Sequence, residues 1–280
     1  MTDALITDKA RTLRALHDQS VLVLPNAWDP ASAALVARAG AAAVATTSGG
    51  VAWSLGRPDG EMLTREEVMA AVRRIAAAVD VPVTADVEGG YGLTPQDVAA
   101  TVRATIEAGA VGVNIEDSRA ADGTLLPVEE QMQRIQAARK AAASAGVPEF
   151  VINVRTDVYL FQIGEPAGRL DAVLARVAGY AKAGADCLFV PGLLNLDTLS
   201  VLTAASPLPV NAMAGPGGPT VAELTAVGVR RISVGTAIAQ AAYGVAERAA
   251  RELLEAGTYH TLDQAVSYPE LNALCTPARR

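Results

Sequence analysis

The chain has 280 residues, of which 51% are hydrophobic and 19% charged, and its 30 acidic against 23 basic residues leave a net charge of −7. This apolar content excludes a mainly disordered chain, and the acidic balance argues against nucleic acid or a membrane surface as a partner. Two cysteines are too few for a disulfide framework, and the sequence shows no signal peptide or long apolar run, so a cytoplasmic protein is predicted.

Apolar runs alternate with helical patterns along the chain. After an N-terminal helix over 1–20, strands are predicted at 21–28, 42–48, 81–88, 111–117, 150–156, 187–191, 209–213 and 230–235. Helices are predicted at 30–39, 65–79, 95–108, 128–145, 169–183, 195–205, 219–227 and 236–256, followed by a short helical tail over 258–280.

The strand segments are apolar throughout, which is typical of parallel strands that helices cover on both faces. Eight βα units therefore predict an α/β protein, a (β/α)8 barrel forming one domain over 1–280, with the barrel itself at 21–257. A doubly wound open sheet is the alternative.

Acidic residues stand where these strands end. Asp86 and Glu88 close the third strand two residues apart, a spacing that directs both side chains to the same side of a strand. Glu116 and Asp117 close the fourth strand, and Asp59 follows the second. Because like charges this close require a proton or a cation, we predict a hard divalent metal at these strand ends, Mg²⁺, or Mn²⁺ in its place. Capping of helices or pairing with arginines is the alternative.

Arg155 closes the fifth strand and faces the same opening if the alternation holds. A guanidinium beside a metal suits bidentate capture of a carboxylate or phosphonate, whereas a structural salt bridge to Glu116 or Asp157 is the alternative. Gly49 and Gly50 follow the second strand and would let backbone N–H groups approach an anion. The three lysines lie on predicted helices, which disfavours a Schiff-base enzyme.

Six short segments occur in the order TTSGG (46–50), GRPDG (56–60), DVEGGYG (86–92), NIEDS (114–118), NVRTD (153–157) and PVNAM (209–213). In this order they resemble the isocitrate lyase and phosphoenolpyruvate mutase superfamily, and the match extends over residues 25–237. The resemblance implies a barrel enzyme that binds Mg²⁺ and a 2-oxo acid. It also implies that a C–C or P–C bond is made or broken next to an enolpyruvate.

The resemblance also implies individual roles. Asp86 corresponds to the direct metal ligand, and Asp59, Glu88 and Glu116 correspond to acids that hold metal-bound waters. Substrate-binding positions correspond to Trp28, Asp29, Ser48, Gly49, Gly50, Arg155 and Asn211. Three of these site residues are the candidate catalytic groups, namely Asp59, Glu116 and Arg155.

One loop departs from the family pattern. Lyases acting on isocitrate-like substrates carry a Lys-Lys/Arg-Cys-Gly-His loop after the fourth strand, and phosphonate mutases carry an Asn there, whereas this chain has SRAADGTLLPVEEQ at 118–131. Cleavage of isocitrate or methylisocitrate is therefore disfavoured. We predict a Mg²⁺-dependent carbon–carbon lyase on a small 2-oxo acid, with oxaloacetate decarboxylation as the concrete reaction. Phosphonopyruvate hydrolase, phosphoenolpyruvate mutase and a non-catalytic 2-oxo acid binding protein are the alternatives.

The segment 236–256 is long for a barrel helix. Members of the family that the chain resembles exchange their last helix between subunits, which implies a homotetramer built as a dimer of dimers. The alternative is a helix that packs on its own barrel.

Overall fold

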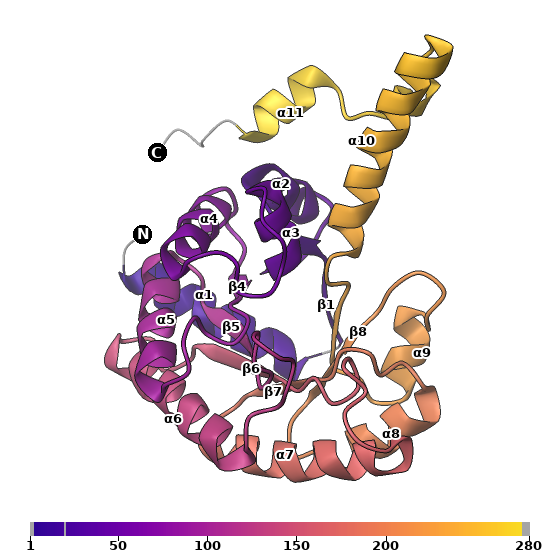
Figure 1. Ribbon diagram of the computed structural model, residues 1–280. Coiled ribbons are helices and arrows are strands. Elements are labelled where there is room, and N and C mark those ends of the chain that lie inside the picture. Colours follow the sequence, from indigo (N-terminus) through magenta and orange to yellow (C-terminus); the bar gives the residue numbers. More distant parts are fainter. Residues whose placement is uncertain (1–2, 20, 276–280) are drawn as a thin grey trace.

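The computed structural model describes residues 3–19 and 21–275, and its centre is a parallel β-barrel (Figure 1). Neighbouring strands follow the order β1-β9-β8-β7-β6-β5-β4-β3-β2. The strands are β1 (Leu22–Leu24), β2 (Asn26–Ala27), β3 (Val44–Thr46), β4 (Val83–Asp86), β5 (Gly112–Glu116), β6 (Val151–Arg155), β7 (Cys187–Phe189), β8 (Val210–Met213) and β9 (Arg231–Ser233).

The first predicted strand is divided at Pro25, and this division explains why nine strands replace the eight expected. Proline has no N–H to donate to a strand ladder, so pairing is interrupted at this residue. On one side Leu22 pairs with Arg231 of β9, and on the other Asn26 pairs with Ala45 of β3. Both ends of the sheet thus belong to one stretch of chain, which closes the ring. The predicted barrel is confirmed, and the open-sheet alternative is wrong.

Helices surround the barrel (Figure 1). They are α1 (Asp3–Asp18), α2 (Pro30–Arg38), α3 (Ser48–Ser54), α4 (Arg65–Ala77), α5 (Pro95–Glu107), α6 (Val128–Ser144), α7 (Arg169–Ala183), α8 (Leu196–Ala205), α9 (Val221–Ala226), α10 (Ala237–Ala256) and α11 (Tyr268–Cys275), with short 3₁₀ turns η1 (Pro166–Gly168) and η2 (His260–Leu262). Thr64 and Thr94 begin α4 and α5 through capping boxes, because each hydroxyl accepts from the third residue of its helix. The sequence did not predict the seven-residue helix α3.

The N-terminal helix α1 lies against the amino-terminal end of the barrel. Its Leu13 is fully buried, and a Cβ added to Gly112 at the start of β5 would lie 3.1 Å from a Leu13 methyl group. Lys9 of the same helix donates to the carbonyl of Val79. Since the helix covers part of this end, the opposite end is the place expected for a site, as the barrel architecture predicts. Residues 1, 2 and 20 of the predicted helix lie outside the described residues.

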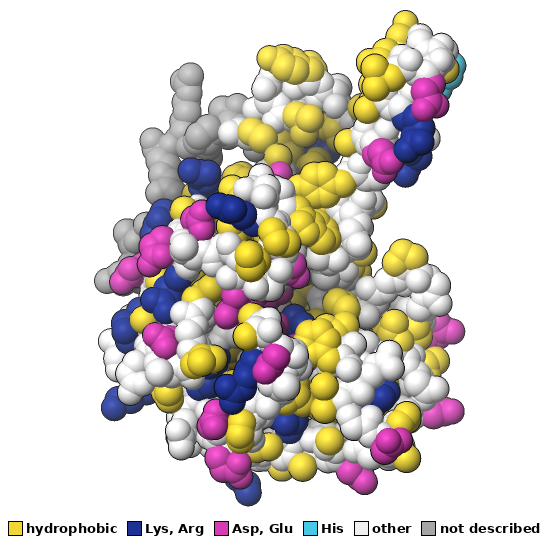
Figure 2. Space-filling view, in the orientation of Figure 1, with side chains coloured by type: hydrophobic (Ala, Val, Ile, Leu, Met, Phe, Trp, Pro, Cys, Tyr) yellow, Lys and Arg dark blue, Asp and Glu magenta, His cyan; other side chains and the backbone are white. Residues whose placement is uncertain are grey.

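The long helix α10 points away from the barrel, and the chain returns so that α11 packs against α2 (Figure 1). In α10 only Ala239 is buried. Its far end exposes Leu253 and Leu254, the latter 85% accessible, and apolar side chains gather there in Figure 2. The predicted helical tail corresponds to η2 and α11, and residues 276–280 lie outside the described part. Among residues 3–19 and 21–275, no helix combines the length and apolar character needed to span a membrane. That one domain covers the chain stays a prediction.

Candidate functional site

Charged side chains meet at the carboxyl ends of three neighbouring strands. Asp86 is the last residue of β4, Glu116 of β5 and Arg155 of β6. Glu116 and Arg155 are also paired in register across β5 and β6. We call the opening formed by Ser48, Asp86, Glu116 and Arg155 the mouth of the barrel.

Arg155 bridges two acids at the mouth. Its Nη1 lies 2.7 Å from Glu116 Oε2, and its Nε lies 2.6 Å from Asp157 Oδ1. Burial alone would lower the pKa of Arg155, but the charges of Glu116 and Asp157 outweigh it and raise that pKa. The structural salt bridges expected as the alternative role are therefore present. Nη2 has no hydrogen-bond partner within the described ranges, so one edge of the guanidinium remains available to a ligand.

Glu116 lies within a compact acidic group. Burial raises its pKa, and the neighbouring charges of Asp157, Asp86 and Glu88 raise it further, while Arg155 opposes them. The Ser118 hydroxyl donates to Asp157 Oδ2 at 2.5 Å and lies 3.1 Å from Glu116 Oε1. One serine from the atypical loop thus connects the two carboxylates that share Arg155.

The carboxylate of Asp86 has only weak hydrogen bonds. Ser48 N lies 3.5 Å from its Oδ2, and Glu88 N lies 3.4 Å from its Oδ1, both near the limit of a hydrogen bond. Burial raises the pKa of Asp86, and the charge of Asp59 adds to this, whereas Arg155 acts in the opposite direction. Half-buried carboxylate oxygens that are poorly satisfied by protein donors fit a hard cation such as Mg²⁺.

Glu88 does not continue the alternation of β4, so this part of the sequence analysis was wrong. The strand ends at Asp86, and Glu88 has a left-handed backbone with φ of 49°. Its Oε2 accepts from Gly60 N at 3.1 Å and Glu61 N at 2.5 Å, and its Oε1 accepts from the Tyr91 hydroxyl. The side chain therefore fastens the loop that carries Asp59 over the mouth.

Burial raises the pKa of Glu88 to about 7, with the charges of Asp86, Asp59 and Glu61 adding to the effect, although the hydrogen bond from Glu61 opposes it. Glu61 and Tyr91 also have left-handed backbones, with φ of 56° each, and Tyr91 N donates to Glu61 Oε1. Non-glycine residues are uncommon in this region, and such conformations gather at functional sites.

Two arginines that the sequence analysis did not select hold the loop after β4. Buried Arg134 of α6 donates to the carbonyls of Gly89, Gly92 and Leu93. Arg65 of α4 donates to the Tyr91 carbonyl and to a threonine hydroxyl of α5. Neither arginine forms an ion pair within residues 3–19 and 21–275, so their donors are used for positioning the loop backbone.

The predicted glycine cradle is the first turn of α3. A Cβ at Gly49 would lie 3.1 Å from Asp59 Oδ2, and one at Gly50 would lie 2.8 Å from Trp28 Cβ. Glycine is needed here so that Asp59 and Trp28 can approach the backbone. The structure therefore brings Trp28, Asp59 and the Ser48–Gly50 turn together beside Asp86.

Two predicted substrate-binding residues are engaged elsewhere. Asp29 caps α2, where its Oδ1 accepts from Ser32 N at 2.7 Å. Asn211 is fully buried: its Oδ1 accepts from Asn153 Nδ2, and its own amide donates to the Ser233 hydroxyl and to backbone carbonyls. The Asn211 amide is thus engaged within the protein and Asp29 acts as a helix cap, and their assignment to the substrate stays a prediction.

No group of three or more His, Cys, Asp and Glu side chains in the described part is arranged closely enough to ligate a metal directly. A magnesium ion does not require one, because it commonly binds one or two carboxylates and keeps several waters. The predicted metal set of Asp86, Glu88, Glu116 and Asp59 therefore stays a prediction, with Asp86 best placed for direct contact.

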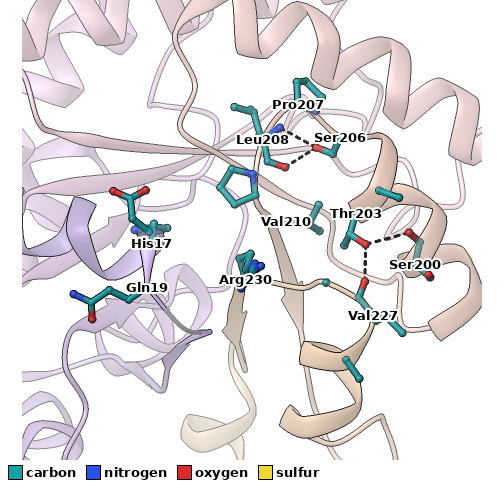
Figure 3. Close-up of a pocket in the computed structure, with 15 residues that line it drawn as sticks. His17, Gln19, Ser200, Thr203, Ser206, Pro207, Leu208, Val210, Val227 and Arg230 are labelled. Atoms are coloured by element: carbon teal, nitrogen blue, oxygen red, sulfur yellow. Dashed lines mark hydrogen bonds between the residues drawn. The ribbon is translucent and has the colours of Figure 1, made fainter.

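A hollow of about 680 Å³ opens at the other end of the barrel (Figure 3). Its lining includes His17, Thr203, Leu208 and Arg230, from α1, α8 and the segments that enter β8 and β9. It contains no cluster of acids, and it lies where barrel residues usually serve stability rather than chemistry. The mouth remains the candidate site.

Comparisons with known proteins find relatives over most of the chain. The family model for phosphoenolpyruvate phosphomutase matches residues 13–254. An uncharacterized protein of Mycobacterium tuberculosis is 36% identical over 92% of this chain and 93% of its own length. The 2-methylisocitrate lyase of Escherichia coli is 33% identical over 70% of this chain and 66% of its own.

Solved structures include proteins of similar fold. A Burkholderia cenocepacia protein provisionally named a phosphonomutase is 46% identical, with a TM-score of 0.84, over 87% of this chain and 99% of its own. A phosphonopyruvate hydrolase solved with oxalate and Mg²⁺ is 25% identical, with a TM-score of 0.83, over 95% of this chain and 94% of its own.

Proposed function

The chain belongs to the phosphoenolpyruvate mutase/isocitrate lyase superfamily, and on this premise we propose that it is a Mg²⁺-dependent carbon–carbon lyase acting on a small 2-oxo acid. The observation that carries the proposal is the pairing at the mouth of a weakly satisfied acid, Asp86, with an arginine, Arg155, whose Nη2 is unpartnered. An anionic substrate that also chelates a cation fits both groups.

We assign the binding roles as follows. Asp86 would hold Mg²⁺, with Asp59, Glu88 and Glu116 binding its waters. The ion would supply a Lewis acid that stabilises negative charge on the 2-oxo oxygen. Arg155 Nη2 would donate to the substrate carboxylate, and the N–H groups of the Ser48–Gly50 turn would orient its other end.

Decarboxylation of oxaloacetate fits this set of groups. When the bond between the carboxylate and its neighbouring carbon breaks, its electron pair passes into the adjacent carbonyl to give an enolate, and CO₂ leaves. This step needs a stabilised negative charge but no acid to begin. The absence of Cys and His from the 118–131 loop is therefore compatible with this reaction, whereas it disfavours isocitrate-type cleavage.

A second candidate is P–C bond chemistry, as a phosphonopyruvate hydrolase or a phosphoenolpyruvate mutase. The relative provisionally named a phosphonomutase favours it, since that protein is 46% identical to this chain. A phosphonate would use the same free edge of Arg155, because guanidinium groups bind both kinds of anion.

Calorimetry and product assays test these proposals together. We expect oxalate to bind only with Mg²⁺ present, and oxaloacetate to yield pyruvate and CO₂ at a rate that depends on Mg²⁺. Turnover of phosphonopyruvate alone would replace the lyase with the second candidate. Tight oxalate binding without turnover of either compound would identify a non-catalytic binding protein, and absent oxalate binding would contradict the site itself.

A further inference from the structure

The interior of the barrel just below the mouth holds a chain of polar side chains. Asn114 of β5, Asn153 of β6, Asn211 of β8 and Arg231 of β9 are all buried, and Asn153 Nδ2 donates both to Asn114 Oδ1 at 2.8 Å and to Asn211 Oδ1 at 3.0 Å. These bonds satisfy Asn153 Nδ2 and the two amide oxygens that it reaches, whereas Asn153 Oδ1 and Arg231 Nε are buried without a hydrogen-bond partner.

Arg231 fixes the orientation of one of these amides. Its Nη2 lies 3.0 Å from Asn114 Oδ1, and its Nη1 lies 3.3 Å from His17 Nε2 of α1. A guanidinium has only donors, so the atom of Asn114 that faces it must be the oxygen. The second donor, from Asn153, reaches the same oxygen. Asn114 Nδ2 is therefore directed away from both.

Asn114 Nδ2 has no hydrogen-bond partner among residues 3–19 and 21–275, and it is not among the fully buried unpartnered atoms, in a residue that is 6% exposed. Asn114 is the register partner of Asp86 and precedes Glu116 by two residues on the inward face of β5. Its free donor thus lies next to the acid that the proposed function assigns to the metal.

We propose that Asn114 is a substrate-binding residue whose Nδ2 donates to an oxygen of the 2-oxo acid, and that Arg231 is the positioning residue that orients it. This inference rests on the proposed function and extends it. Asn211, the amide that the sequence analysis selected, has its donors and acceptor engaged inside the protein, so Asn114 takes the role of the amide at the mouth.

Arg231 carries its charge at a cost. It is completely inaccessible, burial lowers its pKa, and it forms no ion pair in the described part of the chain. A buried charge without an opposite charge is destabilising. A buried arginine without an opposite charge is expected where it has a function, and here its Nη2 determines which atom of Asn114 faces the ligand.

The test uses oxalate as the probe, with Mg²⁺ in excess, and two variants of the full chain. Asn114→Leu keeps the branched shape of the side chain but removes its donor, together with the acceptor for Arg231 and Asn153. We expect oxalate affinity to fall roughly 3- to 10-fold while Mg²⁺ affinity is unchanged. Asn114→Asp keeps the acceptor toward Arg231 but replaces the donor with negative charge. We expect it to weaken oxalate more than roughly 10-fold without lowering the thermal midpoint, since Arg231 gains an anionic partner.

Thr203→Val is the control, because it removes a partly buried hydrogen bond to the Val227 carbonyl at the opposite end of the barrel, and this variant should bind oxalate normally. If Asn114→Leu does not fold, Asn114→Asp decides the question alone. Unchanged oxalate affinity in Asn114→Asp overturns the assignment while leaving the proposed function standing. If the wild-type chain binds no oxalate with Mg²⁺, the proposed function fails and this assignment fails with it.

Discussion

Arg231 Nη1 lies 3.3 Å from His17 Nε2, so the last strand of the barrel and the helix beneath it share a hydrogen bond. His17 Nδ1 lies 2.8 Å from the Leu13 carbonyl, which can only accept, so Nδ1 carries the proton and Nε2 is the bare acceptor for Arg231. The imidazole is therefore neutral in the folded protein.

This pairing predicts a loss of stability in mild acid. Burial, and then the charge of Arg231, lower the pKa of His17 from 6.5 to about 4. Below pH 6.5 His17 is protonated in the unfolded chain, but in the folded chain it stays neutral down to about pH 4. The free energy of unfolding therefore falls as the pH is lowered through this window. Between pH 7 and pH 5 this effect of His17 lowers the free energy of unfolding by about 2 kcal/mol.

Urea unfolding of wild type and His17→Gln at both pH values measures this contribution. The glutamine amide can accept from Arg231 but does not titrate, so the decline from pH 7 to pH 5 should be about 2 kcal/mol smaller in the variant. Equal declines in the two proteins would show that His17 is protonated in the folded state.

We predict that Asp86→Ala abolishes Mg²⁺ binding and leaves the fold intact. The carboxylate receives only hydrogen bonds of 3.4 and 3.5 Å, so its removal costs the folded chain little. Calorimetry with Mg²⁺, with circular dichroism as the test of folding, measures both effects. Asp8→Ala, an exposed change on α1, is the matched control. Metal affinity that survives in Asp86→Ala would remove the basis of the site.

We predict that Arg155→Lys weakens oxalate binding by roughly 1–3 kcal/mol, the scale of a charge-assisted hydrogen bond. The planar guanidinium of arginine can donate to Glu116, Asp157 and a ligand at once, whereas the single ammonium group of a lysine cannot. Titration calorimetry gives the oxalate affinity, and thermal unfolding should show lower stability, because one buried acid loses its partner. A variant with full affinity and reduced stability would assign Arg155 to structure alone.

We predict that the chain assembles through α10 into a dimer of dimers. An isolated helix that buries only Ala239 would leave its apolar residues in water, and a partner subunit would cover them. Stability should then rise with protein concentration. Light scattering at micromolar concentration checks this, and a mass near the 28.7 kDa of one chain that does not change on dilution excludes the assembly.

The barrel could be predicted because its strands are short apolar runs that Ala-rich helices separate. The division at Pro25 and the helix α3 could not, since the first turn of α3 contains Gly49 and Gly50, which usually indicate a turn rather than a helix. The position of Asp86, Glu116 and Arg155 followed from their place at strand ends. The orientation of Glu88 could not be predicted, because side chains alternate between faces only within a strand and β4 ends at Asp86.

The buried polar network of the barrel interior is partly visible in the sequence. Asn114 precedes Glu116 by two residues, and Asn153 precedes Arg155 by two, so the same face of both strands carries an amide one step below the site. The roles of Arg134 and Arg231 depend on loop carbonyls and on residues distant in sequence, and no local pattern indicates them.

The interrupted first strand has a consequence for the synthesis of the protein. Leu22 pairs with Arg231, so the ring cannot close until more than two hundred further residues have left the ribosome. At roughly 5–20 residues per second this takes on the order of ten seconds or more. During that interval β1 presents unpaired backbone groups, and unpaired strand edges favour association with other chains. Slow or interrupted translation near the 3′ end of the message should therefore cause aggregation of this protein more readily than the same delay early in the message.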